Sequence, residues 1–153
     1  IGAGQVMPRM VTWARFQVIG SRRTFVMYDT HFPYRDQDEA SRTRCAQEIL
    51  ARLRDLPART PIVLTGDFNT GPDSRVHAIL TQMLADTRIS APTHSGPDKT
   101  FQNFTGTPDQ RIDWILVRGF RALDSRTVTY NQHGRYPSDH FPVMVDLAWP
   151  DSR

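Results

Sequence analysis

The chain has 153 residues, of which 39% are hydrophobic and 23% are charged, and its formal net charge is +3. These values are typical of a single soluble globular domain, and no apolar run reaches the roughly 18 residues that a membrane-spanning helix needs. The single cysteine, Cys45, excludes an internal disulfide and a multi-cysteine zinc site. The mild positive charge is compatible with a phosphate-bearing substrate, and equally with a solvated arginine-rich surface.

The first half of the chain is predicted to form a β-hairpin, a helix and a short buried strand. Residues 9–20 alternate apolar and polar side chains, and residues 24–32 are predicted to form the returning strand. Residues 39–56 carry apolar side chains at helical spacing, and we expect Cys45 to pack on the apolar side of that helix. Two prolines end the helix and lead into the apolar run of residues 62–65, which fits a strand covered on both faces.

The second half is predicted to contain one more helix, followed by short strands and loops. The helix would be capped by Asp73 or Ser74 and would run to about Met83. The expected fold class is α/β, with several short strands and two helices. Strands are predicted at residues 111–119, 120–130 and 140–149, and loops at residues 90–100 and 131–139.

Side chains suited to acid–base chemistry stand where four predicted strands meet loops. Each position alone has an ordinary structural explanation, because a single histidine at a strand end is usually hydrogen-bonded and Asp, Asn, Gly and Pro all favour turns. An aspartate inside an apolar strand is less ordinary, because a buried charge needs a partner. Ligands bind beyond the strand ends of open α/β sheets, so we expect the four ends to converge. The side chains concerned are His31, Asp67, Asn69, Asp113, Asp139 and His140.

This set of side chains suits the hydrolysis of a phosphate ester. The reaction needs an aligned water, a base that accepts its proton, and positive charge near the phosphate. Carboxylates suit Mg²⁺, which takes oxygen ligands, whereas two histidines far apart in the sequence do not indicate zinc. A serine hydrolase and a P-loop nucleotide hydrolase are disfavoured, because neither G-x-S-x-G nor G-x-x-x-x-G-K-[ST] occurs.

The segments DTHF, GDFN, RIDWIL and PSDHFPV resemble, in order and approximate spacing, the endonuclease/exonuclease/phosphatase superfamily. The resemblance covers residues 8–147. It implies a two-sheet, four-layer α/β sandwich with helices outside. It also implies a metal-dependent phosphoesterase that directs water in line at phosphorus. The implied cofactor is Mg²⁺, with Mn²⁺ as the alternative.

The resemblance implies roles for the residues that handle water and metal. Asp67 would orient or deprotonate the attacking water, and Asn69 would hold that water or a phosphate oxygen. Asp139 would ligate the metal. The family's other main metal ligand is a glutamate in the first half of its domain, and no segment of this chain matches it. Glu39 and Glu48 are predicted to lie on the polar side of the helix and do not correspond to it.

The remaining matching residues are implied to handle the phosphate. His140 would contact the scissile phosphate, with Asp113 hydrogen-bonded to the other ring nitrogen. A carboxylate beside an imidazole favours the protonated ring and fixes its orientation. His31 would be a second phosphate contact and a proton donor.

Residues 1–153 are therefore expected to be the C-terminal portion of one such domain, with the N-terminal half absent. That half would lie on another chain, or would have been lost by trimming. The alternative is a catalytically inactive binding module. In the first two cases this chain alone is expected to be inactive and to expose apolar strand faces.

The sequence leaves the phosphate ester open among nucleic acid, a phospholipid headgroup and a sugar phosphate. Phe101, Phe104 and Arg111 are candidates for a nucleic-acid groove, because bases stack on aromatic rings. The other interpretation is that the two phenylalanines are packing residues. Three histidines match no motif and are predicted to be surface residues: His77, His94 and His133.

Overall fold

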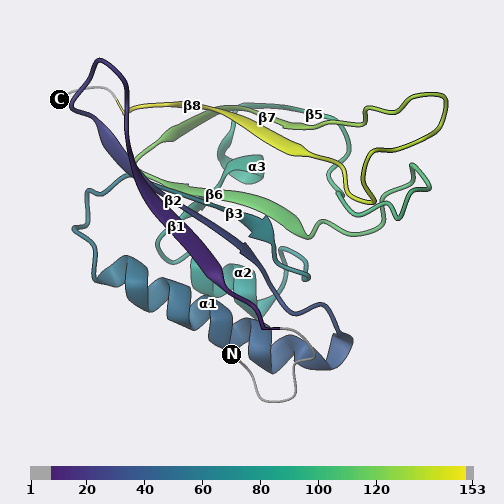
Figure 1. Ribbon diagram of the computed structural model, residues 1–153, viewed down its shortest axis with the longest axis horizontal. Helices are drawn as coiled ribbons and strands as arrows, with labels where there is room; N and C mark the ends of the chain where they lie inside the picture. Colours follow the sequence, from purple (N-terminus) through teal and green to yellow (C-terminus); the bar gives the residue numbers. More distant parts are fainter. Residues whose placement is uncertain (1–7, 151–153) are drawn as a thin grey trace.

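The computed structural model describes residues 8–150 and contains two β-sheets, with the longest helix packed outside them (Figure 1). The larger sheet has five strands in the order β1-β2-β3-β6-β4. These strands are β1 (Val11–Gln17), β2 (Thr24–His31), β3 (Ile62–Asp67), β4 (Ala85–Asp86) and β6 (Asp113–Arg118).

The smaller sheet has three strands in the order β5-β7-β8 and lies above the first sheet in Figure 1. Its strands are β5 (Thr93–Ser95), β7 (Arg121–Thr127) and β8 (Val143–Ala148). Figure 1 shows helices α1 (Glu39–Arg54) and α2 (Arg75–Leu80) on the opposite side of the first sheet, so the layers run helices, sheet, sheet. The predicted α/β class with two sheets is confirmed. The other helical segments are η1 (Asp36–Asp38) and α3 (Thr87–Ser90).

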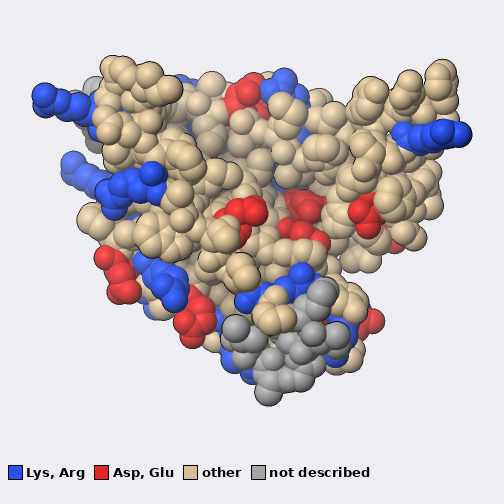
Figure 2. Space-filling view, viewed as in Figure 1, with Lys and Arg blue, Asp and Glu red and all other residues tan. Residues whose placement is uncertain are grey.

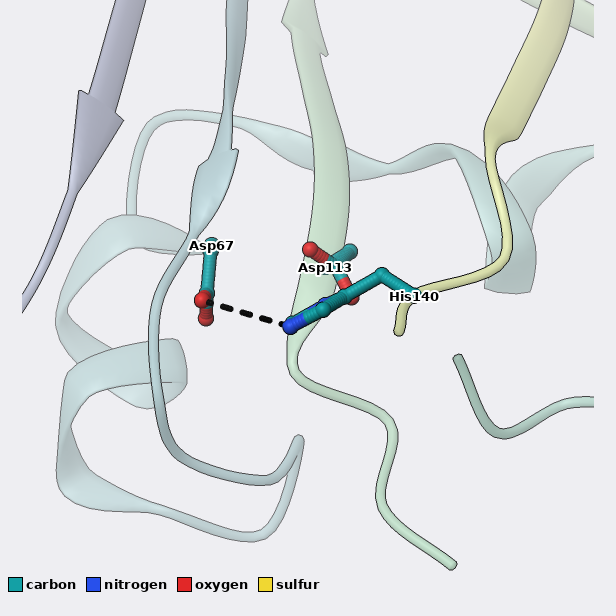
Figure 3. A group of neighbouring side chains, drawn as sticks. All are labelled: Asp67, Asp113 and His140. Carbon is teal, nitrogen blue, oxygen red and sulfur yellow. Dashed lines mark hydrogen bonds and ion pairs between the residues drawn. The ribbon is translucent and has the colours of Figure 1, made fainter. Parts of the chain in front are cut away.

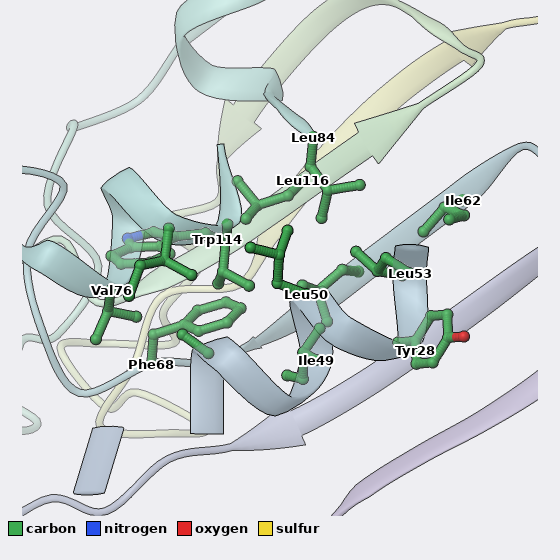
Figure 4. Close-up of a cluster of buried hydrophobic side chains, with 14 of the residues drawn as sticks. Tyr28, Ile49, Leu50, Leu53, Ile62, Phe68, Val76, Leu84, Trp114 and Leu116 are labelled. Carbon is green, nitrogen blue, oxygen red and sulfur yellow. The ribbon is translucent and has the colours of Figure 1, made fainter. Parts of the chain in front are cut away.

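The main hydrophobic core lies between the first sheet and helices α1 and α2 (Figure 4). Cys45 is half-buried and packs against this core, as predicted. Burying one large apolar side chain contributes about 1.5–3 kcal/mol, so the core fixes the strands firmly against the helices. Its members include Val26, Tyr28, Leu50, Leu53, Ile62, Leu64, Trp114 and Leu116.

The pairing of the three central strands brings the predicted site residues to one edge of the sheet. β2 and β3 are parallel, and α1 provides the crossover that such a pair requires. In this register His31 lies beside Asp67. β3 and β6 are antiparallel, and their register places Asp67 beside Asp113. Residues 31, 67 and 113 therefore stand side by side at the same end of three neighbouring strands.

Gly66 permits the close approach of β2 and β3 just before this edge. A Cβ atom at position 66 would collide with the main-chain oxygen of Thr30. Phe68, on the other side of Asp67, is fully buried and stacks on Trp114 with ring centroids 4.5 Å apart. Asp67 is thus fixed on both sides. Gly66 before it lies in a close contact between two strands, and Phe68 after it is packed in the core.

Several boundaries differ from the sequence prediction for identifiable reasons. The last strand starts at Val143 rather than at residue 140, because Pro142 has no N–H to donate. Ser74 caps α2, as predicted, but the helix ends at Leu80 and continues as turns. The predicted loop of residues 90–100 contains the short strand β5. A strand of three residues is too short to show an alternating pattern in the sequence.

Strand β1 forms an edge of the first sheet and exposes large apolar side chains. Trp13 is 60% exposed and Phe16 is 45% exposed. Isolated domains rarely leave an aromatic-bearing edge strand open, so the expectation that another segment covers it stays a prediction. Among residues 8–150, no helix is long and apolar enough to cross a membrane.

Candidate active site

Three of the predicted residues meet in one cluster where β3, β6 and the segment before β8 converge (Figure 3). Ligand-capable atoms of Asp67, Asp113 and His140 all lie within 4.8 Å of one another. His31, at the end of β2, joins them through its Nε2 atom, 3.3 Å from Asp67 Oδ2. Figure 2 shows acidic side chains gathered in a hollow between the two layers, in the middle of this face.

Asp113 and His140 form a hydrogen-bonded pair, with His140 Nδ1 2.8 Å from Asp113 Oδ2. A carboxylate only accepts hydrogen bonds, so Nδ1 carries the proton and Nε2 points toward Asp67. Nε2 lies 4.0 Å from Asp67 Oδ2. The Phe101 ring packs against the imidazole in a T-shaped arrangement, with centroids 5.1 Å apart.

Thr100 fixes the carboxylate of Asp113, and sequence reasoning did not single it out. Its hydroxyl donates to Asp113 Oδ2 over 2.6 Å and accepts from the N–H groups of Ile112 and Asp113. Its main-chain oxygen accepts from the N–H of Phe141, next to His140. Thr100 is 1% exposed, so it ties both members of the pair to the interior. A threonine after a loop carries no sequence signal that would have identified it.

The electrostatic environment shifts both groups that face the hollow. Burial raises the pKa of Asp67, and the charge of Asp113 raises it further, against the opposing effect of the Asn69 N–H. Desolvation lowers the pKa of His140, but the hydrogen bond and charge of Asp113 and the charges of Asp67 and Asp139 outweigh it, so the net shift is upward. A carboxylate and an imidazole that both have a raised pKa suit proton transfer and charge stabilisation near a phosphate.

Asn69 adopts a left-handed backbone conformation, with φ of 51°. Its N–H donates to Asp67 Oδ1 over 2.8 Å, and its side-chain amide donates to the main-chain oxygen of Phe32 over 3.0 Å. These bonds orient the Asp67 carboxylate and tie the turn to the end of β2. The turn suggested by the sequence is therefore present, and it shapes the site.

Asp139 lies in the loop before β8, beside the cluster in sequence but outside the group of three. Its main-chain oxygen accepts from the N–H groups of Gln102 and Asn103, both over 2.9 Å. The Ser138 hydroxyl donates to its carboxylate over 3.3 Å. Gln102 is 2% exposed and donates to the Ser138 main-chain oxygen over 2.6 Å, so it locks this loop; sequence analysis missed it.

The sequence profile of the Endonuclease/Exonuclease/phosphatase family matches residues 4–140, which is most of the chain. This chain belongs to that family. Among curated proteins it is 34% identical to Protein angel of Drosophila melanogaster, covering 69% of this chain and 30% of that protein. A UPF0294 protein of Vibrio vulnificus is 26% identical, covering 69% of this chain and 33% of that protein.

Solved structures of the Endonuclease/Exonuclease/phosphatase fold also match. A conserved protein of unknown function from Enterococcus faecalis is 30% identical, with a TM-score of 0.88 over 98% of this chain and 60% of that one. A mannosyl-6-phosphatase from Bacteroides thetaiotaomicron is 25% identical, with a TM-score of 0.81 over 97% of this chain and 60% of that one. The chain spans about a third of the two curated relatives and 60% of these two structures.

The donor set of this Endonuclease/Exonuclease/phosphatase chain suits a hard divalent cation only in part. Asp113 and His140 already use facing atoms on each other and on Thr100, so they are poorly placed as ligands. The carboxylates of Asp67 and Asp139 have the oxygen donors that Mg²⁺ prefers. Glu39 and Glu48 are exposed on α1, as predicted, and Glu39 forms an ion pair with the buried Arg42. A complete metal shell would need further ligands besides these two aspartates.

Two predictions about other residues are wrong, and they share one cause. His77 is buried rather than on the surface, and its Nε2 lies 2.8 Å from Asp86 Oδ2. Arg111 is also buried and donates to both oxygens of Asp86, over 2.7 and 2.6 Å, so it does not line a nucleic-acid groove. His94 and His133 are exposed, as predicted.

Proposed function

We propose that the protein containing this chain is a metal-dependent phosphoesterase that directs a water molecule in line at phosphorus. The observation that carries the proposal is the continuous line Thr100–Asp113–His140–Asp67, with successive contacts of 2.6, 2.8 and 4.0 Å. One end of this line is anchored in the interior, and the other presents a carboxylate and an imidazole to the hollow. Membership of a family of phosphate-ester hydrolases supports it.

In this proposal Asp67 orients the attacking water and accepts its proton. Its raised pKa makes it a better base than an ordinary aspartate. Asn69 holds the Asp67 carboxylate through its N–H and is proposed to hold the water or a phosphate oxygen. The end of β3 and the turn that follows it would therefore activate the water.

The imidazoles supply positive charge to the phosphate. His140, whose pKa is raised, binds a non-bridging oxygen through Nε2 while Asp113 holds Nδ1. His31 is 53% exposed at its side chain and is proposed as a second contact, placed to donate a proton. Fixed donors of this kind stabilise the charge that develops in the transition state.

The acidic hollow supports a cation requirement. Carboxylates at positions 67, 113 and 139, whose charges all act on His140, would repel a phosphate anion unless a positive ion offset their charge. Asp139 is proposed to hold Mg²⁺ or Mn²⁺, which would stabilise charge on the phosphate and the leaving oxygen. The other ligands are proposed to come from an N-terminal half of the domain, on the same protein or on a second chain.

The test is hydrolysis of a bis-aryl phosphodiester and of mannose 6-phosphate by the complete protein, with Mg²⁺ or with EDTA. Asp67→Asn and His140→Gln are each expected to lower kcat by about 10²–10⁴-fold without altering the circular dichroism spectrum. His94→Gln is the matched control, because His94 is exposed and outside the site. Full activity in both site variants would sink the proposal, whereas no hydrolysis of either ester by the wild-type protein with Mg²⁺ would favour an inactive binding module.

A further inference from the structure

A tight turn beside the site holds a phenylalanine in a backbone conformation that favours glycine. The N–H of Thr105 donates to the main-chain oxygen of Gln102 over 2.9 Å, which closes a four-residue turn. Both central residues have positive φ, 47° at Asn103 and 60° at Phe104. This is the pattern of a type I′ turn, in which Asn-Gly is preferred and a bulky second residue is disfavoured.

Contacts from around the turn enforce this conformation. The buried side-chain oxygen of Gln102 accepts from the N–H of Gly106 over 2.9 Å. The hydroxyl of Thr105 donates to the Gln102 main-chain oxygen over 2.6 Å. A Cβ atom at Gly106 would collide with the hydroxyl of Tyr136, so the following residue also has no freedom. Strain that surrounding contacts hold in this way concentrates at functional sites.

The enforced turn presents its aromatic ring to solvent. Phe104 is 58% exposed, whereas Phe101 is half-buried against His140 and Phe141 is buried. The turn is bonded to the site, because the N–H of Asn103 donates to the main-chain oxygen of Asp139. Figure 1 shows the loops before β6 and before β8 projecting from the same end of the molecule. The exposed ring therefore lies on a turn that is hydrogen-bonded to the loop carrying Asp139, and it is not part of the packed interior.

We propose that Phe104 stacks on the nucleobase of a nucleotide-containing phosphoester, a substrate class that rests on the proposed function. An exposed ring on a rigid turn offers a flat face, and bases of any sequence stack on such faces. The polar side chains of Gln102 and Thr105 are committed inside the loop. The exposed ring of Phe104 offers a stacking surface to a planar base, whereas the side chains of Gln102 and Thr105 are not available to the hydroxyl groups of a sugar.

The experiment compares adenosine 5′-monophosphate with ribose 5-phosphate, which share the phosphate and sugar and differ in the base. Binding is measured by calorimetry on the complete protein carrying Asp67→Asn, so that turnover does not contribute. Phe104→Gly is expected to weaken the nucleotide by about 5- to 100-fold and to leave ribose 5-phosphate within about twofold. The same variant should raise the melting temperature, because glycine relieves the turn.

Further variants separate stacking from loop damage. Phe104→Trp should retain nucleotide binding, and Phe104→Leu, which keeps an apolar side chain without a π face, should lose it. Phe16→Ala is the control, because Phe16 is an exposed aromatic that pairs with Phe25, at the end of β2 opposite His31.

Equal losses for both ligands, an unchanged nucleotide affinity, or undetectable nucleotide binding by the starting protein would each overturn the inference. A loss confined to ribose 5-phosphate would do so as well, in favour of a sugar. If the variants show base-dependent binding but the wild-type protein hydrolyses no phosphate ester, the proposed function is overturned and nucleobase stacking on Phe104 still stands.

Discussion

Two carboxylate–histidine pairs in this molecule have the same chemistry and opposite surroundings. Asp113–His140 and Asp86–His77 both have a ring nitrogen 2.8 Å from a carboxylate oxygen. The side chains of Asp113 and His140 are 17% and 24% exposed and face a hollow, whereas those of Asp86 and His77 are 2% and 10% exposed. Asp86 of the buried pair also binds Arg111, so its negative charge is neutralised inside the protein. Only the pair that keeps one ring nitrogen facing solvent can act on a ligand.

Removing the carboxylate charge from Asp113–His140, the open pair, should have the largest effect. We expect it to lower turnover without lowering stability. Asp113→Asn leaves His140 without the group that orients and charges it, so kcat in the complete protein should fall by about 10²–10⁴-fold. The free energy of unfolding should change by less than about 1 kcal/mol, because the site is partly solvated. Steady-state kinetics and urea unfolding check this prediction, and a large loss of stability with normal turnover per folded molecule would contradict it.

The same substitution in the buried pair should reverse the pattern. Asp86→Asn leaves the buried guanidinium of Arg111 without its counter-charge, which costs about 3–5 kcal/mol of stability. Turnover per folded molecule should stay within about threefold of the wild type, since Asp86 does not face the hollow. Urea unfolding followed by circular dichroism measures the loss. If Asp86→Asn unfolds like the wild type, the two pairs do not differ in the way described.

The pH dependence of stability should distinguish the buried pair as well. Burial tends to raise the pKa of Asp86, but the hydrogen bond from His77 and the charge of Arg111 outweigh it, so the pKa lies below its usual 3.8. A depressed folded pKa gives stability that is present above 3.8 and is lost as the pH falls through the folded value. The stability difference between wild type and Asp86→Asn should therefore shrink in acid. A difference that stays constant down to pH values below 3.8 would contradict this origin.

The smallest effect on turnover should come from Thr100, whose hydroxyl donates to Asp113 of the open pair. Thr100→Val removes one hydroxyl from the Asp113 carboxylate and should lower kcat about tenfold, because a hydrogen bond to a charged group is lost. Thr100→Ser keeps the hydroxyl and should restore kcat to within about twofold. Rescue by serine separates orientation of Asp113 from simple packing. Equal losses in both variants would assign Thr100 a packing role only.

The sequence predicted the open site better than the buried pair, for physical reasons. His31, Asp67 and Asp113 end or begin strongly apolar strands, so their convergence follows from strand pairing alone. His77 lies on a helix of six residues, too short for a clear apolar period, and its partner Asp86 lies in a two-residue strand. Arg111 looked available because it opens the predicted strand beside a loop, where a charged side chain is usually solvated. Its burial depends on tertiary packing that no local pattern records.

Gly66 should tolerate no other residue, although it has no side chain that could take part in the chemistry. Because no side chain fits there beside Thr30, the gap between two main chains sets the spacing of His31 and Asp67. Even an alanine would have to push the strands apart and would displace reacting groups one residue away. In a saturation mutagenesis screen scored by hydrolytic activity, position 66 should therefore be as intolerant as Asp67. Such a screen would class a residue with no functional group as catalytic, and only a measurement of strand geometry would tell the two apart.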